Sequence, residues 1–451
     1  MLRNLCYDVR GLKQLNMSGS EFQSNFHVCI IGGGVVGLTG GILLRRQGFQ
    51  VTILERDPTL QTTGAGIQLH PNAVRVLQEI GVFEKMMAKS IVPFSITLKS
   101  YGTGQVLHKQ DLQEPAHKYG APLLTLHRAH LRQVLYDEAL AYGVTIRHGI
   151  KINVDGVDLT SGTLKLADTS ETIHADLFIG ADGGESVVRT ALIGHKPKAI
   201  PHGKIVHRIL IQEKDIIARP HLKYLVEKPN IIVWLGPECE AVTYGLDGVF
   251  NVAFTWPWSK APEDMFYSAQ SVDLDDFRSK LVNWEPDLRE ILSLGTDCLR
   301  WMFFEPVADD ESTPWFDAGG KFCIVGDAAH RGLPYLGQGA AAGIESVSTL
   351  AQLLGKANNH DQVREGLGIY QRLRKERTGH VIRATLKTGE VWQMADGPLK
   401  EERDRQFLYE TPTVGYPNPL ADPFFQEWLW GFDATKTANE AWEAHQKERN
   451  Y

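Results

Sequence analysis

The chain lacks the features that mark several large classes of protein. Its 451 residues contain five cysteines, an odd number without metal-ligand or redox-motif spacing. We therefore expect buried free thiols in a reducing compartment rather than a disulfide framework or a metal site. No internal repeat or low-complexity block is visible, and 43% hydrophobic with 22% charged residues is an ordinary globular composition. This composition excludes a largely disordered, collagen-like or coiled-coil protein.

An excess of positive charge and long apolar runs are also missing. The net charge of −7 argues against nucleic acid as a partner. The apolar stretch Val28–Leu44 is shorter than the roughly 20 residues of a membrane span, and glycines interrupt it. Residues 1–26 carry basic residues but no apolar run, so we expect a flexible arm rather than a signal peptide. The sequence predicts a cytoplasmic protein without a membrane span.

The first motif follows an apolar run typical of a buried parallel strand, Val28–Ile31. A G-x-G-x-x-G pattern comes next, followed by an expected helix over 38–47 and a second strand over 50–54. In this pattern Gly32 permits the tight turn, Gly34 lets the backbone approach a pyrophosphate, and Gly37 lets the helix pack closely. Glu55 can accept a hydrogen bond from a ribose 2′-hydroxyl. These features predict a site for NAD or FAD rather than NADP.

Two later segments favour a flavin. A strand over 321–325 leads to Asp327, which can hold the hydroxyls of a ribityl chain. The glycines of 334–340 would let backbone N–H groups approach a flavin ring, and the helix that begins near Gly339 and Ala340 can stabilise negative charge on it. Asp182 follows another apolar run. It is either part of a strand-ending Asp-Gly turn or a further cofactor contact.

Together these segments resemble the class A FAD-dependent aromatic monooxygenases, the para-hydroxybenzoate hydroxylase and salicylate hydroxylase family. The resemblance covers roughly residues 27–390, and the tail near 425–433 is similar to that of fungal members. It implies that Asp182, with Gly183 and Arg189, serves FAD and the nicotinamide donor. It also implies a flavin-edge loop over 64–68, with Gly66 and Gln68 in contact with FAD, and support for FAD from Arg128 at a helix start.

The resemblance also implies an activity. Such an enzyme binds FAD non-covalently, uses NAD(P)H as a transient co-substrate and consumes O2. Through a flavin C4a-hydroperoxide it would hydroxylate or oxidatively dearomatise a phenolic or polyketide-type aromatic small molecule, in secondary or aromatic-compound metabolism. The alternatives are a flavin oxidoreductase of the same fold without oxygen insertion, and a non-enzymatic binding protein on an FAD-type fold. A monomer and a homodimer are both compatible with the sequence.

Two residues of the β-rich middle are candidates for holding the substrate. Arg208 lies on an expected strand between Val206 and Leu210, and Tyr244 has apolar neighbours at the same spacing. By resemblance these two residues hold a phenolate, whereas a salt-bridged arginine and a core tyrosine are the structural alternatives. His330 is interpreted as structural rather than as a general base. No metal site is predicted at His127 and His130, because no third ligand is near.

The expected fold class is α/β. A Rossmann-like FAD-binding domain of residues 27–90, 120–195 and 296–365 is interleaved with a β-sheet substrate domain of residues 91–119 and 196–295. This is the arrangement of para-hydroxybenzoate hydroxylase-like proteins. A flexible arm over 1–26 precedes these domains, and a helical C-terminal region over 366–451 follows them. An Asp247-Gly248 turn predicts a tight hairpin in the substrate domain.

Overall fold

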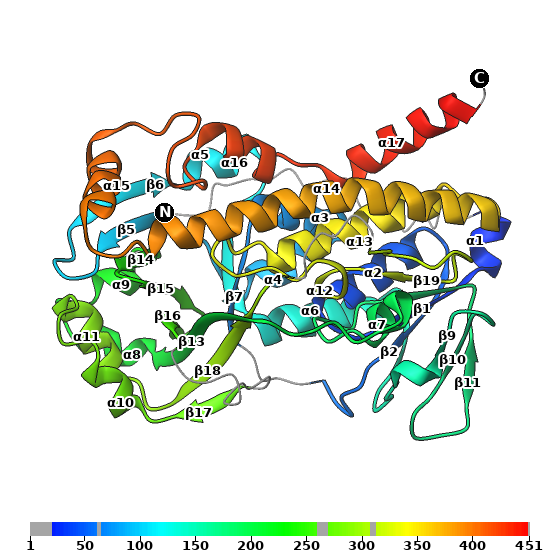
Figure 1. Ribbon diagram of the computed structural model, residues 1–451, viewed down its shortest axis with the longest axis horizontal. Helices are drawn as coiled ribbons and strands as arrows, with labels where there is room; N and C mark the ends of the chain where they lie inside the picture. Colours follow the sequence, from blue (N-terminus) through cyan, green and yellow to red (C-terminus); the bar gives the residue numbers. More distant parts are fainter. Residues whose placement is uncertain (1–19, 61–64, 259–268, 307–312, 450–451) are drawn as a thin grey trace.

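A computed structural model describes residues 20–60, 65–258, 269–306 and 313–449. Figure 1 shows two sheet-containing parts side by side, with the long helix α14 (His360–Trp392) running along both. At 33 residues and about 1.5 Å per residue, α14 spans about 50 Å. One helix therefore contacts elements that belong to different sheets.

The first part is built on a five-stranded parallel sheet of order β19-β12-β1-β2-β8. Its strands are β1 (His27–Ile31), β2 (Gln50–Leu54), β8 (Thr145–Arg147), β12 (Leu177–Gly180) and β19 (Phe322–Ile324). Helices on this sheet include α2 (Val35–Arg46), α6 (Arg128–Ala141), α7 (Val187–Ile193), α12 (Asp327–His330) and α13 (Gly339–Gly355). The strands are apolar runs because both faces of the sheet are covered. The predicted strand–turn–helix–strand over 28–54 is confirmed, with the helix beginning three residues earlier than expected.

Smaller elements complete this part. Two three-stranded sheets are ordered β3-β7-β4 and β11-β10-β9. Their strands are β3 (Gly66–Leu69), β4 (Ser90–Ile91), β7 (Leu124–His127), β9 (Val157–Asp158), β10 (Thr163–Lys165) and β11 (Thr172–His174). The remaining helices here are α1 (Glu21–Asn25), α3 (Pro71–Glu79), α4 (Phe83–Met87) and the 3₁₀ turn Val154–Gly156. Helix α5 (Gln113–Lys118) belongs to the second part, where it lies beside α16 (Pro423–Trp430), as Figure 1 shows.

The second part is an eight-stranded sheet of order β17-β18-β13-β16-β15-β14-β5-β6. Its strands are β5 (Ser95–Ser100), β6 (Val106–Asp111), β13 (Pro201–Gln212), β14 (Ile231–Gly236), β15 (Cys239–Leu246), β16 (Val249–Pro257), β17 (Gln270–Val272) and β18 (Cys298–Phe304). The hairpin between β15 and β16 turns at Asp247-Gly248, as predicted. Gly248 has a φ of +76°, a left-handed conformation that glycine adopts without a side-chain clash.

The two faces of the eight-stranded sheet pack against different partners. One face, with Phe250 and Val252, packs on α10 (Leu274–Ser279) and α11 (Pro286–Ser293), next to the short helices α8 (Glu213–Ile217) and α9 (Tyr224–Glu227). The other face, with Tyr244, packs on Leu336, on α14, and on the tail helix α16 (Pro423–Trp430). Helices α15 (Pro398–Tyr409) and α17 (Ala434–Arg449) complete the C-terminal region.

Two boundaries differ from the sequence expectation. Strand β18 is hydrogen-bonded to β13, so residues 298–304 belong to the eight-stranded sheet and not to the FAD-binding part. Within the expected flexible arm, α1 is a helix, and Phe26 is buried. The Gln23 side chain donates to the Ala357 carbonyl at 2.6 Å, which ties α1 to the end of α13. Residues 1–19 of the arm lie outside the described residues.

Of the five cysteines, Cys29, Cys239, Cys298 and Cys323 are buried free thiols, and Cys6 lies outside the described residues. Among the helices of the described ranges, none is long and apolar enough to cross a membrane.

Candidate active site

The predicted cofactor residues meet along one edge of the parallel sheet. The carboxyl ends of parallel strands lie at the same edge, where α/β folds bind their ligands. Strand β1 leads into the turn at Gly32, β2 ends before Glu55, β12 ends before Asp182, and β19 precedes Asp327. Because β1 lies between β2 and β12, four segments that are distant in sequence share this edge.

The glycine-rich turn has the geometry that its spacing predicted. Gly32 has a φ of +109°, and a Cβ there would lie 2.4 Å from the Ala181 carbonyl oxygen. A Cβ at Gly37 would lie 2.0 Å from the Gly32 carbonyl oxygen, so the helix packs against the turn itself. A Cβ at Gly34 would meet no atom within 4 Å, which leaves open space beside the first turn of α2. A phosphate can approach the free N–H groups there.

The Glu55 carboxylate is buried beside this turn. Its Oε2 atom accepts from the Gly33 N–H at 2.9 Å and from Arg132 Nη2 at 2.8 Å, and its Oε1 atom accepts from the Asp57 N–H at 2.9 Å. Arg132 also donates to the Gly33 carbonyl at 2.9 Å. Since a carboxylate has about four acceptor positions, one remains for the predicted ribose hydroxyl.

The two carboxylate oxygens of Asp182 have different surroundings, which allows both a structural role and a cofactor contact. Its Oδ2 atom accepts from the Val187 N–H at 2.8 Å, which anchors the start of α7. Its Oδ1 atom is buried and has no hydrogen-bond partner among the described residues. Burial raises the pKa of the Asp182 carboxyl. One oxygen is therefore structural, and the other is free to bind a ligand donor.

Asp327 lies close to Asp182 through Arg189. The Arg189 guanidinium donates to the Ala328 carbonyl at 3.0 Å and to the Gly184 carbonyl, so it joins the two acidic segments. Asp327 is exposed, yet the protein atoms around it raise the pKa of its carboxyl. The charges of Arg128 and Arg331 oppose this rise. The Asp327 side chain is therefore accessible at this edge and lies within the electrostatic influence of Arg128.

The predicted flavin-edge residues lie beside the loop that precedes α13. A Cβ at Gly337 would lie 2.8 Å from His70 Nε2 and 3.4 Å from Gln68 Oε1. Burial lowers the pKa of His70 to about 3, so its imidazole is neutral. A Cβ at Gly339, the first residue of α13, would meet no atom within 4 Å. The N-terminus of α13, with Ala340, is therefore open to a ring placed beside this loop. Gly64, the first residue of the predicted flavin-edge loop over 64–68, lies outside the described residues.

Buried polar atoms without partners gather at the same place. Both ring nitrogens of His70, Oδ1 of Asn72 and Nε2 of Gln338 have no hydrogen-bond partner among the described residues. An unpartnered buried polar group costs about 1–3 kcal/mol, so such a cluster indicates a ligand with its own donors and acceptors.

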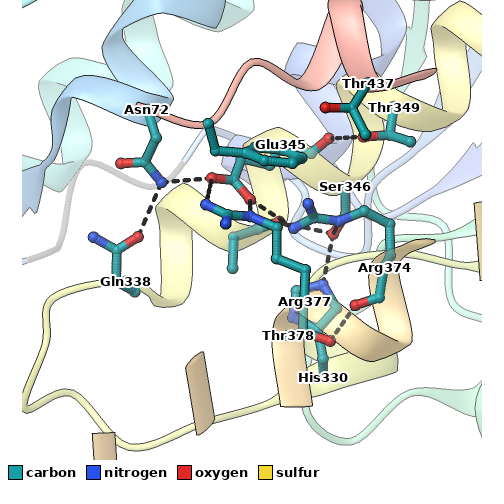
Figure 2. A network of polar contacts seen from close by, with 12 residues as sticks. Asn72, His330, Gln338, Glu345, Ser346, Thr349, Arg374, Arg377, Thr378 and Thr437 are labelled. Carbon is teal, nitrogen blue, oxygen red and sulfur yellow. Dashed lines mark hydrogen bonds and ion pairs between the residues drawn. The ribbon is translucent and has the colours of Figure 1, made fainter. Parts of the chain in front are cut away.

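A buried ion network holds this loop (Figure 2). Glu345 of α13 bonds Arg374 and Arg377 of α14, each at 2.8 Å, and also accepts from Asn72 at 2.6 Å. Asn72 in turn donates to Gln338 Oε1 at 3.0 Å. Burial by itself would raise the pKa of the Glu345 carboxyl, but the two arginines outweigh it and lower that pKa to about 2.

The same network reaches the C-terminal tail. Arg377 donates to the Trp428 and Leu429 carbonyls at 3.1 and 3.0 Å, and its guanidinium carbon lies 3.7 Å from the centre of the Phe432 ring. On the other side, Ser346 accepts from Arg374 at 3.0 Å and bonds His330 at 2.9 Å. Burial lowers the pKa of His330 to about 3, which fits the structural role assigned to it.

Arg208 and Tyr244 lie on the face of the eight-stranded sheet that is turned toward Leu336, in the loop that precedes α13. A Cβ at Gly66 would lie 2.7 Å from the Tyr244 hydroxyl, so the tyrosine contacts the flavin-edge strand β3. Burial raises the pKa of the Tyr244 hydroxyl, and the charge of Arg208 opposes this. Arg208 Nε is buried without a partner, and the guanidinium lies 5.4 Å from the Trp301 ring centre. No ion pair of Arg208 is found among the described residues, so the salt-bridged alternative lacks support.

Sequence reasoning missed several residues of this site. Arg132 was missed although it follows Arg128 by four residues, which places both on one helix face. His70, Gln338 and the Glu345 network carry no local signal, because their partners are distant in sequence. His127 and His130 have ring centres 5.6 Å apart, and no group of three metal-ligating side chains occurs in the described ranges.

Comparison with known proteins gives consistent findings. A family described as "FAD binding domain" matches residues 25–385. The chain is 32% identical over 424 residues to FAD-dependent monooxygenase OpS4 of Beauveria bassiana, covering 92% of this chain and 97% of the relative. It is 31% identical to 3-amino-4-hydroxybenzoate 2-monooxygenase of Streptomyces cremeus, covering 90% and 95%. A solved salicylate hydroxylase substrate complex shares the fold, with a TM-score of 0.74 at 20% identity over 93% of this chain and 98% of that one.

The residues present fit FAD. The open backbone at Gly34 suits a pyrophosphate, and the free positions on Glu55 and Asp327 suit the hydroxyls of the ribose and the ribityl chain. The unpartnered atoms around Gly337 suit the polar edge of a flavin ring. These assignments to single residues stay predictions.

We expect Glu55→Ala to weaken FAD binding at least tenfold, because a hydrogen bond to a charged acceptor contributes about 1.5–3 kcal/mol. Asp327→Ala should act similarly through the ribityl chain. The measurement is titration of apoprotein with FAD, followed by flavin fluorescence. Glu171→Ala removes an exposed carboxylate that pairs with Arg147, and it serves as the control with unchanged affinity. Equal affinities in Glu55→Ala and wild type would contradict the assignment.

We expect Glu345→Gln to lower the free energy of unfolding by about 3–5 kcal/mol, since it leaves two buried arginines without their counter-charge. Chemical denaturation measures the change. The matched control is Glu402→Gln, whose exposed pair with Arg405 should contribute about 0–1 kcal/mol.

The Glu345 effect should depend on pH. Because the folded pKa of about 2 lies below the unfolded value, the ion network stabilises the fold fully above about pH 4.5 and loses this contribution as pH falls toward 2. The difference between wild type and Glu345→Gln should therefore shrink over that range. A difference that is constant from pH 5 to pH 2 would show that the charge of Glu345 is not what stabilises the network.

Proposed function

The chain belongs to the FAD-binding-domain family of flavin-dependent aromatic monooxygenases, and from that premise we propose that it hydroxylates a phenolic or polyketide-type aromatic held by Arg208 and Tyr244. The protein is an FAD-dependent enzyme that uses NAD(P)H and O2. The relatives are named as monooxygenases. They therefore give no support to either alternative, an oxidoreductase without oxygen insertion or a non-enzymatic binding protein.

The observation that carries the proposal is a cationic group with apolar strand neighbours on the sheet face turned toward the flavin-edge strand. Arg208 lies between Val206 and Leu210 on its strand, and its cross-strand neighbours are Ala253 and Leu299. A guanidinium with a buried, unpartnered Nε atom on such a face can bind an oxygen anion. One relative is a 3-amino-4-hydroxybenzoate 2-monooxygenase, which agrees with an anionic aromatic substrate.

When bound, FAD would accept hydride from NAD(P)H and deliver one oxygen atom of O2 to the substrate. The protein residues prepare the acceptor for it. Arg208 stabilises the ionised form of a phenol, which is a better nucleophile than the neutral form. Tyr244 orients the ring against β3, and the apolar residues of the sheet face exclude water from the reacting atoms.

We expect Arg208→Ala to lower product formation 100-fold or more while FAD stays bound and the fold stays intact. This loss corresponds to about 3 kcal/mol of transition-state stabilisation. Reduced flavin still reacts with O2, so peroxide release should rise relative to product. The experiment measures NAD(P)H oxidation, peroxide and hydroxylated product together, using a panel of phenols.

The control variant is Arg300→Ala. Arg300 lies on the neighbouring strand β18, pairs with His207, and therefore points to the opposite face of the sheet. In Arg300→Ala, the fraction of NAD(P)H oxidation that yields hydroxylated product should stay near the wild-type value. If Arg208→Ala retains wild-type coupling, Arg208 is structural and the substrate site lies elsewhere.

We also propose a cytoplasmic location and a monomeric or homodimeric state. The four buried free thiols support a reducing compartment. Gel filtration with light scattering measures the oligomeric state.

A further inference from the structure

Asn251 is a buried amide that the proposed function does not yet use. It lies on β16, it is fully buried, and neither its Oδ1 nor its Nδ2 atom has a hydrogen-bond partner among the described residues. Leaving a buried donor or acceptor unpaired is destabilising, and native proteins rarely do so without a reason. Asn251 leaves both unpaired, in the centre of the sheet.

The sheet register places Asn251 on the substrate face. Its cross-strand neighbours are Tyr244 on β15 and Leu210 on β13. Directly paired residues of an antiparallel sheet point to the same side, so the amide points the same way as the Tyr244 ring. Arg208 lies one row further along the same face, diagonal to Asn251. Diagonal neighbours are about 7–8 Å apart, which is the scale of a substituted aromatic ring.

The three polar residues therefore lie together on this face with mostly apolar neighbours, and the buried pair Glu240 and Thr255 lies one row beyond Arg208, away from Asn251. Val242 and Ala253 lie in the row of Arg208, and Leu210 lies in the row of Asn251. Since β16 lies between β13 and β15, a ring placed over these strands could reach the Asn251 amide with one substituent and the Arg208 cation with another. The cation suits one ionised oxygen, whereas the amide suits a neutral acceptor or donor.

We infer that Asn251 is a specificity-determining residue that binds a second polar substituent of the substrate, a carbonyl oxygen attached to the phenol ring. The inference rests on the proposed function, because it assumes a phenol held by Arg208. It narrows the substrate class from phenols in general to acyl- or carboxyl-substituted phenols. The Nδ2 group donates to the carbonyl oxygen. Only a substrate with such an oxygen offsets the desolvation cost of the buried amide.

A site with an unpaired buried amide discriminates strongly between substrates that can bond the amide and substrates that cannot. A ring that lacks the carbonyl leaves Asn251 unsatisfied, whereas a ring that carries it satisfies the amide. The preference should therefore disappear when the amide is replaced by an apolar side chain of similar size. A loss of packing alone would lower activity with both kinds of ring equally.

The test compares Asn251→Leu with wild type on two phenols of nearly equal size, 2,4-dihydroxyacetophenone and 4-ethylresorcinol. These probes differ in a carbonyl oxygen. The measurements are kcat/KM for hydroxylated product, and the Kd of each phenol from thermal shift of the FAD-loaded protein. We expect wild type to prefer the acetyl compound at least tenfold, and Asn251→Leu to lose that preference at least tenfold while retaining activity on the ethyl compound.

The control variant is Thr243→Val. The Thr243 hydroxyl is also buried and unpartnered, but the residue pairs with Ile232 and Val252 and points to the opposite face. It should keep the wild-type preference. The melting temperature of Asn251→Leu should be unchanged or higher, because an unsatisfied amide is removed. If Asn251→Leu does not retain FAD, Asn251→Ala replaces it.

The outcomes separate the two ideas. A wild-type preference that persists in Asn251→Leu overturns the inference, and so does an equal loss on both phenols. A wild-type enzyme that hydroxylates both phenols equally well also overturns it, while the proposed function stands. If neither phenol binds to wild type or is hydroxylated by it, and no other phenol of the panel is either, the proposed function fails and the inference fails with it.

Discussion

The buried carboxylate of Glu345 is the interaction on which the arrangement of the site depends. A lone charge in a protein interior is strongly destabilising, so Glu345 requires the two arginines of α14 and the Asn72 amide around it. These partners come from two different helices, α14 and α3, and link Glu345 to further segments. Arg377 donates to carbonyls of the tail, Asn72 lies in the first turn of α3, and Gln338 immediately precedes α13. One charge therefore sets the relative positions of a loop, two long helices and the tail.

The parallel sheet imposes a second constraint, which concerns the cofactor. The order β19-β12-β1-β2 brings Asp327, Asp182, the glycine turn and Glu55 to one edge, although they are spread over residues 32–327. Arg189 then joins the Asp182 and Asp327 segments through main-chain carbonyls. Asp182 Oδ1 remains without a partner among the described residues there, and Glu55 keeps one acceptor position free. A ligand with hydroxyls completes the hydrogen bonding.

The small sheet β3-β7-β4, which contains the flavin-edge strand, packs against β15 of the eight-stranded sheet. Tyr244 contacts Gly66 directly, so the substrate face and the cofactor edge are in contact at that point. The polar side chains on the substrate face are few, and most of their neighbours are apolar. Such a surface gives strong electrostatic interactions to a substrate anion, because little water competes there. Substrate selectivity is then a matter of which rows of the sheet carry Arg208, Asn251 and Tyr244.

Local physics explains what the amino-acid sequence determined by itself. Glycine spacing, apolar runs and an Asp-Gly turn act over about ten residues, so the strand–turn–helix at 27–54 and the hairpin at Asp247-Gly248 were predictable. The sheet face of Arg208 followed from period-2 alternation alone. Tertiary structure decided the rest, since partners such as Asn72 and Glu345 are 273 residues apart, and no local pattern encodes such a pair. The membership of β18 in the large sheet and the unpaired state of Asn251 have the same origin. Both depend on which strands lie side by side, and the free energy that selects those neighbours comes from burial over the whole chain.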